Sequence, residues 1–175
     1  MNAATSRRFT IFVAHPSELL TDHRPHGDGL VSFGFLRRLA ERGHEVHVAA
    51  QQVDVRAPLP PTFHVYPLMP TGGISMADRL TFMVRMRALY RRLSRTVSFD
   101  VVHQMNPVFA GLSLSLLGVR TPLVLGTFVP RWHSEAEVPE SDGPLVTAAK
   151  RSLMGMVTRV QQAQAAGLLD RKSTR

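Results

Sequence analysis

The chain has 175 residues, of which 44% are hydrophobic and 19% charged, the balance of one globular domain with its own core. It contains no cysteine, which excludes disulfides, thiolate nucleophiles and cysteine-ligated zinc. There is no apolar run of about 18 residues, and the apolar stretch near the N-terminus is too short for a signal peptide, so we expect a cytoplasmic protein. The net charge of +8 comes almost wholly from arginine and suits attraction to phosphates or acidic lipids, or equally reflects coding bias. Nucleic-acid binding ranks last, because charge alone supports it.

The first part of the sequence predicts a strand, a loop, a helix and a second strand. Residues 9–14 (FTIFVA) form a continuous apolar run, which is typical of a strand buried on both faces. A polar loop is expected over residues 18–28 and a helix over residues 30–42, where apolar positions share one face and Gly43 follows as a C-cap. Residues 44–49 (HEVHVA) alternate toward the second strand. Such a unit predicts parallel strands joined by a crossover.

Alternating strands and helices continue along the rest of the chain. Strands are expected at residues 63–66, 100–103 and 121–126, and helices at residues 76–97, 108–117 and from Pro144 to about Ala166. The pattern predicts an α/β fold, an open doubly wound parallel sheet of Rossmann-like type in a single domain. Right-handed crossovers predict strand order 3-2-1-4-5 with the first strand central. The domain is expected to span residues 9–169, between a disordered N-terminus (1–8) and a frayed tail (170–175).

The first candidate site is the HGDG segment between the first strand and the first helix. In a doubly wound sheet, ligands bind outside the carboxyl ends of the strands. Gly27, Asp28 and Gly29 are therefore candidates for contact with a phosphate, because glycines let backbone N–H groups approach it and a helix N-terminus favours its charge. The spacing is not that of a dinucleotide fingerprint. Taken alone, the segment is better explained as a plain turn with Asp28 as N-cap.

The second candidate site follows the fourth strand, in the segment DVVHQMNP. His103 ends a buried strand and is the candidate catalytic residue, because an imidazole can donate to a sugar hydroxyl or a leaving phosphate. Asn106 offers both donor and acceptor groups to a carbohydrate. The alternative is a strand-end histidine satisfied by backbone, followed by an Asn-Pro turn. Loops that follow parallel strands leave one edge, so these residues should converge with Gly27 and Gly29.

A series of arginines marks the long helix expected at residues 76–97. With neighbouring apolar residues it suits contact with an anionic membrane surface, and otherwise it is a solvated helix face. The series consists of Arg79, Arg85, Arg87, Arg91, Arg92 and Arg95. The histidines other than His103 show no HExxH or other metal spacing, so we expect no metal site.

Two ordered segments resemble GT-B glycosyltransferases. One is the strand FTIFVA followed by LVSFGFLRRLAERGHEVHVAA, in which a helix ends before GHEV and the second strand. The other, FDVVHQMNPVFAGLSLSLLGVRTPLVLG, resembles the family-four, retaining branch more particularly. The resemblance covers about residues 9–130. An inverting, family-one-like enzyme and a non-catalytic Rossmann-like module that docks on a membrane or partner remain alternatives.

The resemblance implies a glycosyltransferase (hexosyltransferase type) that moves a sugar from a nucleotide-sugar to an acceptor hydroxyl. It implies no metal and no cofactor besides the donor substrate, and a leaving phosphate that helps deprotonate the acceptor. Gly27 and Gly29 match the loop that touches the donor diphosphate, and His103 matches the first histidine of the family's H-x-H pattern, whose second position is Met105 here. Asn106, Pro107 and Arg131 are the acceptor-binding candidates.

The family has a second domain that holds the donor with a basic pair and a Glu-x7-Glu element. These 175 residues contain no such element, so we expect them to be the N-terminal, acceptor-side half. On this interpretation the chain is truncated or relies on a separate donor-binding domain, and it is inactive alone. Peripheral contact with the inner face of a membrane is an open expectation.

Overall fold

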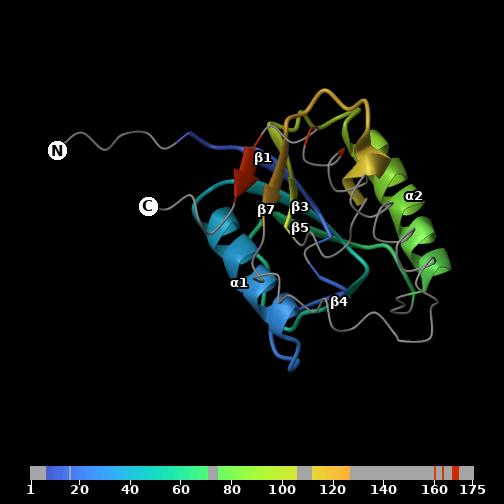
Figure 1. The fold of residues 1–175 in the computed structure, drawn as a ribbon. Coiled ribbons are helices and arrows are strands. Elements are labelled where there is room, and N and C mark those ends of the chain that lie inside the picture. Colours follow the sequence, from blue (N-terminus) through green and yellow to red (C-terminus); the bar gives the residue numbers. More distant parts are fainter. Residues whose placement is uncertain are drawn as a thin grey trace.

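The computed structural model describes residues 7–15, 17–70, 75–105, 112–126, 160, 163 and 167–169. Within these ranges, six parallel strands form one sheet in the order β5-β3-β1-β6-β7-β8 (Figure 1). The strands are β1 (Thr10–Ala14), β3 (Glu45–Ala50), β5 (Phe63–Pro67), β6 (Val101–Gln104), β7 (Leu123–Gly126) and β8 (Gly167–Leu169). The predicted order of the first five sheet strands is confirmed. A sixth strand, β8, which no pattern predicted, is added beside β7.

Two helices cover opposite faces of the sheet: α1 (Gly27–Glu41) on one side and α2 (Met76–Leu93) on the other (Figure 1). Side chains alternate along a strand, so the central β1 contributes to both layers. Ile11 and Val13 pack in the core beneath α1, whereas Phe12 and Ala14 pack in the core beneath α2. This two-sided burial is the reason that the first strand is apolar throughout.

The segment after β1 differs from the predicted polar loop. Residues Leu19–Thr21 form strand β2, which pairs in parallel with β4 (Gln52–Asp54) in a separate two-stranded sheet. Leu20 is completely buried in the core beneath α1. The expectation of a loop over residues 18–28 was therefore wrong for its first part. A strand of three residues is too short for the alternation of apolar and polar residues to be recognised in the sequence.

The helix boundaries differ from the sequence pattern by one turn. Helix α1 begins at Gly27 instead of residue 30, since His26 is the N-cap and its Nδ1 accepts from the N–H of Gly29 at 3.2 Å. Helix α2 ends at Leu93 instead of residue 97. Of the helix expected at residues 108–117, the described part is the 3-10 helix η1 (Leu112–Leu116).

Several expectations fall largely outside the described residues. The helix expected up to Ala166 is represented there only by the helical residues Val160 and Ala163. Most of the N-terminal segment (1–8) and all of the tail (170–175) also lie outside, so the domain limits stay predictions. None of the helices in the described ranges has the length and apolar content needed to cross a membrane.

Candidate functional site at the carboxyl edge of the sheet

Buried polar side chains gather where the chain leaves the carboxyl ends of β1, β3 and β6. His15 follows β1, Gln51 follows β3, and His103 and Gln104 end β6; each of these side chains is buried. This edge, at the point where the strand order reverses between β1 and β6, is where open α/β sheets bind ligands. We call these four residues the carboxyl-edge cluster.

His15 has the most constrained position of the cluster. Its backbone φ is +49°, in the left-handed region that residues other than glycine rarely adopt. The backbone N–H of His15 donates to the carbonyl of Ala49 at 3.0 Å. The ring packs edge-on against Phe82 of α2, with centroids 5.2 Å apart. Burial lowers the pKa of His15 to about 4, with positively charged Arg79 adding to the shift, so the imidazole is neutral at pH 7. Unusual φ values of this kind concentrate at functional sites.

Gln51 links β3 to His15. Its side-chain nitrogen lies 3.4 Å from Nε2 of His15, and its residue is fully buried. Within the described part of the chain, the Oε1 atom of Gln51 has no hydrogen-bond partner. A buried carbonyl without a donor costs about 1–3 kcal/mol, so it marks a place where a ligand hydroxyl is accommodated favourably.

His103 lies on the other face of the sheet, toward α1. It is paired in register with Val13, and its ring is 6.5 Å from that of Phe35 in α1. Burial lowers the pKa of His103 to about 4, and its Nε2 has no hydrogen-bond partner among the described residues. A neutral, desolvated imidazole of this kind has one ring nitrogen that donates a hydrogen bond and one that accepts, and it carries no positive charge at pH 7.

The predicted glycine site has a different setting from the one expected. The first turn of α1 contains Gly27, Asp28 and Gly29. The N-cap is His26, and not Asp28 as the sequence suggested. A Cβ atom at Gly29 would lie 2.1 Å from the carbonyl oxygen of Leu19, whereas one at Gly27 would meet nothing within 4 Å. Gly29 is therefore required for the close approach of α1 to β2. The negative charge of Asp28, in the first turn, interacts favourably with the positive end of the helix dipole.

No described contact joins these glycines to His103. Phe35, which touches His103, lies eight residues beyond Gly27, about 12 Å along the helix. The remaining predicted residues, Asn106, Pro107 and Arg131, lie outside the described residues. Their convergence with the glycines at one crevice thus stays a prediction.

Sequence reasoning overlooked His15 and Gln51. Both positions directly follow an apolar strand, as His103 does at the end of its own strand. Applying the carboxyl-end rule to every strand would have found them. The positive φ of His15 has only a weak sequence signal, because histidine is one of the residues enriched in that region but rarely adopts it.

Comparison with known proteins assigns the chain to a family. The model of Glycosyltransferase Family 4 matches residues 29–130, more than half of the chain. The chain belongs to Glycosyltransferase Family 4, which confirms the predicted resemblance. The matched segment includes β3, β5, α2, β6 with His103, and β7, and it begins at Gly29. No curated protein matches the chain.

Proposed function

We propose that this chain is the acceptor-side domain of a glycosyltransferase that moves a sugar from a nucleotide-sugar to an acceptor hydroxyl with retention of configuration. Family membership supports the class of reaction. The observation that carries the acceptor assignment is the carboxyl-edge cluster, whose imidazoles and amides are buried and neutral. Neutral donors and acceptors match uncharged sugar hydroxyls, whereas a diphosphate calls for cations and exposed N–H groups.

Within this proposal, His15, Gln51 and His103 hold and orient the acceptor by hydrogen bonds. His103 remains the candidate nearest the chemistry, acting as a neutral hydrogen-bond partner because its pKa is lowered to about 4 by burial. Gly27, Asp28 and Gly29 are proposed to face the donor diphosphate at the start of α1, where the backbone N–H groups of Gly27 and Asp28 would contact it, since that of Gly29 donates to His26. Asn106, Pro107 and Arg131 are proposed to extend the acceptor site.

The donor is proposed to be held by a second domain of the family type, without a metal or another cofactor. Closure of that domain over the carboxyl edge would exclude water and stabilise the leaving phosphate by basic side chains and helix dipoles. The 175-residue protein by itself is expected to show no glycosyl transfer. We propose a cytoplasmic location for the reaction.

The proposal is tested by ligand binding to the purified 175-residue protein. Histidine side-chain resonances are followed by NMR while methyl hexosides or UDP- and GDP-sugars are added. We expect methyl hexosides to shift the resonances of His15 and His103 and to leave those of half-buried His44, which lies before β3 at the opposite end of the sheet, unchanged. We expect His103→Gln to weaken hexoside binding at least about tenfold, the loss of one buried hydrogen bond. Turnover of a nucleotide-sugar, or micromolar donor binding without hexoside binding, would contradict the acceptor-side assignment.

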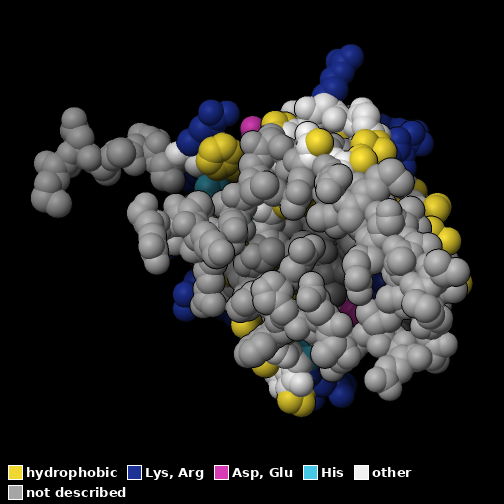
Figure 2. Space-filling view, in the orientation of Figure 1, with side chains coloured by type: hydrophobic (Ala, Val, Ile, Leu, Met, Phe, Trp, Pro, Cys, Tyr) yellow, Lys and Arg dark blue, Asp and Glu magenta, His cyan; other side chains and the backbone are white. Residues whose placement is uncertain are grey.

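A second function is favoured by the outer face of α2. Met76, Leu80 and Val84 recur every four residues and are 68%, 55% and 70% exposed. Figure 2 shows hydrophobic side chains along the edge of the molecule where α2 lies, with basic side chains close to them. Exposed Arg91 lies on the same helix. We infer that this face docks peripherally on an anionic membrane.

Vesicle sedimentation tests the membrane contact. We expect the protein to bind phosphatidylglycerol-containing vesicles, less at high salt, and to ignore pure phosphatidylcholine vesicles. Leu80→Ser with Val84→Ser should remove most of the binding. The matched control is Val31→Ser, which removes an exposed apolar side chain from α1. Equal binding by the double variant and the control would rule out the α2 face.

A further inference from the structure

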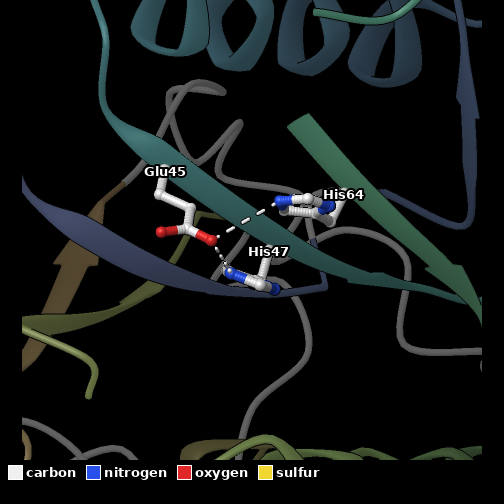
Figure 3. A group of neighbouring side chains, drawn as sticks. All are labelled: Glu45, His47 and His64. Atoms are coloured by element: carbon white, nitrogen blue, oxygen red, sulfur yellow. Dashed lines mark hydrogen bonds and ion pairs between the residues drawn. The ribbon is translucent and has the colours of Figure 1, made fainter. Parts of the chain in front are cut away.

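Three metal-ligating side chains meet on the face of the sheet that α2 covers. Glu45 and His47 are two residues apart on β3, so they point to the same face. His64 lies on the neighbouring strand β5, directly opposite His47 in the register. Figure 3 shows the carboxylate of Glu45 directed toward both imidazole rings. The grouping depends on strand pairing, which is why no spacing in the sequence revealed it.

The distances suit one small cation. The same carboxylate oxygen, Oε1 of Glu45, lies 3.2 Å from Nε2 of His47 and 3.6 Å from Nε2 of His64. All three potential ligand atoms lie within 4.8 Å of one another. Ligand atoms around a tetrahedral zinc ion are about 3.3 Å apart, given metal–ligand bonds of about 2.0–2.1 Å. Two of the pairs already match, and the two imidazole nitrogens, which lie within 4.8 Å of each other, can be brought to the same spacing by a tilt of the rings.

The surroundings allow that tilt and also orient one ligand. The rings of His47 and His64 are stacked with centroids 4.5 Å apart at an angle of 26°. The side chains of Glu45 and His64 are 45% and 38% exposed, which leaves them free to rotate and gives an ion a path from solvent. His47 is buried, and its Nδ1 lies 3.0 Å from the hydroxyl of Tyr66. A hydrogen bond at the second nitrogen is the usual support of a metal-bound imidazole, because it fixes the ring and its tautomer.

We propose that Glu45, His47 and His64 bind a divalent transition-metal ion, Zn²⁺ by the chemistry of the donor set, with solvent completing the coordination. Two imidazoles and one carboxylate form a ligand set that zinc prefers and that calcium and magnesium do not.

The proposed ion has a structural role separate from glycosyl transfer. Along β3, Glu45 is about 20 Å and His47 about 13 Å from Gln51, so the metal site lies away from the carboxyl-edge cluster, toward the amino end of the strand. The ion would link β5, an edge strand of the sheet, to β3, because its ligands come from both of these paired strands. Because the unfolded chain does not form this site, the free energy of metal binding would stabilise the pairing of β5 with β3.

Zinc titration of the metal-free, untagged protein tests the proposal. Isothermal calorimetry should show one site of micromolar or tighter affinity, and Co²⁺ should give the visible absorption of a tetrahedral site. His64→Gln and Glu45→Gln each remove one partly exposed ligand, so the fold tolerates them, and each should weaken binding at least about 10–100-fold. The matched control is His44→Gln, which removes a histidine adjacent in sequence whose Nδ1 accepts from the N–H of Phe9. It should bind zinc as the unaltered protein does.

A thermal measurement gives a second readout. At about a hundredfold excess of zinc over its Kd, the melting temperature should rise by roughly 5–10 °C, because the ion binds the folded state selectively. His64→Gln should lose this rise and His44→Gln should keep it. Zinc binding that is absent below about 1 mM, or that is unchanged in both His64→Gln and Glu45→Gln, would overturn the proposal.

Discussion

Two glycines in the same helical turn make different demands on the chain. Gly29 brings the backbone of α1 against the carbonyl oxygen of Leu19, where an added Cβ would lie at 2.1 Å. Gly27 faces open space. The backbone of β2 cannot move away easily, because Leu20 beside it is fully buried. A structural requirement therefore accounts for Gly29 whether or not a phosphate binds there.

Gly29→Ala should destabilise the protein by about 2 kcal/mol or more, because the methyl group forces α1 away from β2. Gly27→Ala is the matched control. It should be neutral or stabilise the fold by up to about 1 kcal/mol, since alanine has less conformational freedom to lose. Urea denaturation of both variants measures the difference. Similar midpoints for the two variants would show that α1 yields at Gly29.

The backbone of His15 predicts an unusual order of stability among its variants. At φ +49°, alanine suffers the same steric cost as histidine, whereas glycine does not. His15→Ala and His15→Gly both lose the ring contact with Phe82. We expect His15→Gly to be the more stable of the two by about 1 kcal/mol, from urea midpoints. An advantage for His15→Ala would mean that the chain relaxes away from this φ.

At the scale of elements, strong periodic patterns gave correct predictions and short pairings did not. The apolar run at residues 9–14 and the helix pattern after it led to the central strand β1 and to α1, and crossover handedness led to the strand order. β2 and β4 have three residues each and are held by pairing with one another, which one sequence segment cannot show. The candidate site was only half predicted for the same reason. His103 follows from its own strand, whereas the proximity of His15 and Gln51 depends on β1 pairing with β3.

The small β2–β4 sheet has its own stabilising contact at Asp22. The carboxylate accepts from the N–H groups of Arg56 at 3.0 Å and Ala57 at 2.7 Å, and Nδ1 of His23 lies 2.9 Å away. These hydrogen bonds, that to Arg56 first, hold the pKa of Asp22 well below its usual range. The carboxylate thus joins the end of β2 to the chain leaving β4.

Asp22→Ala should therefore lower the melting temperature, because it leaves two backbone N–H groups without their acceptor. Hydrogen exchange of Arg56 and Ala57 should accelerate selectively, with strands β1 and β3 unaffected. Asp78→Ala, at the start of α2, is a control of the same chemical change away from this sheet. Unchanged exchange at both amides would show that the hydrogen bonds at Asp22 are not needed to order this segment.

At the scale of the whole molecule, the two ends of the sheet have different chemistry. The carboxyl edge holds buried neutral polar groups, and the amino end of β3 and β5 holds a carboxylate with two imidazoles. The two helices occupy the faces between these ends (Figure 1). Because α1 and α2 cover the faces, the carboxyl edge is the part of the sheet left for the proposed second domain, and the proposed membrane contact of α2 lies on a different surface.

The folded protein should lose stability between pH 6.5 and about 4.5, through His15 and His103. Burial lowers the pKa of each from 6.5 to about 4, so only the unfolded chain takes up protons there. Above pH 6.5 both imidazoles are neutral in either state and have no effect. As the pH falls, protonation favours unfolding by up to about 3 kcal/mol for each histidine, an upper limit reached near pH 4. Urea midpoints between pH 7.5 and 4.5 measure the slope, and His103→Gln should reduce it, while His15 and buried His47, whose pKa burial also lowers, maintain the remainder. A midpoint that does not vary with pH, or an equal slope after His103→Gln, would mean that these imidazoles reach solvent in the folded state.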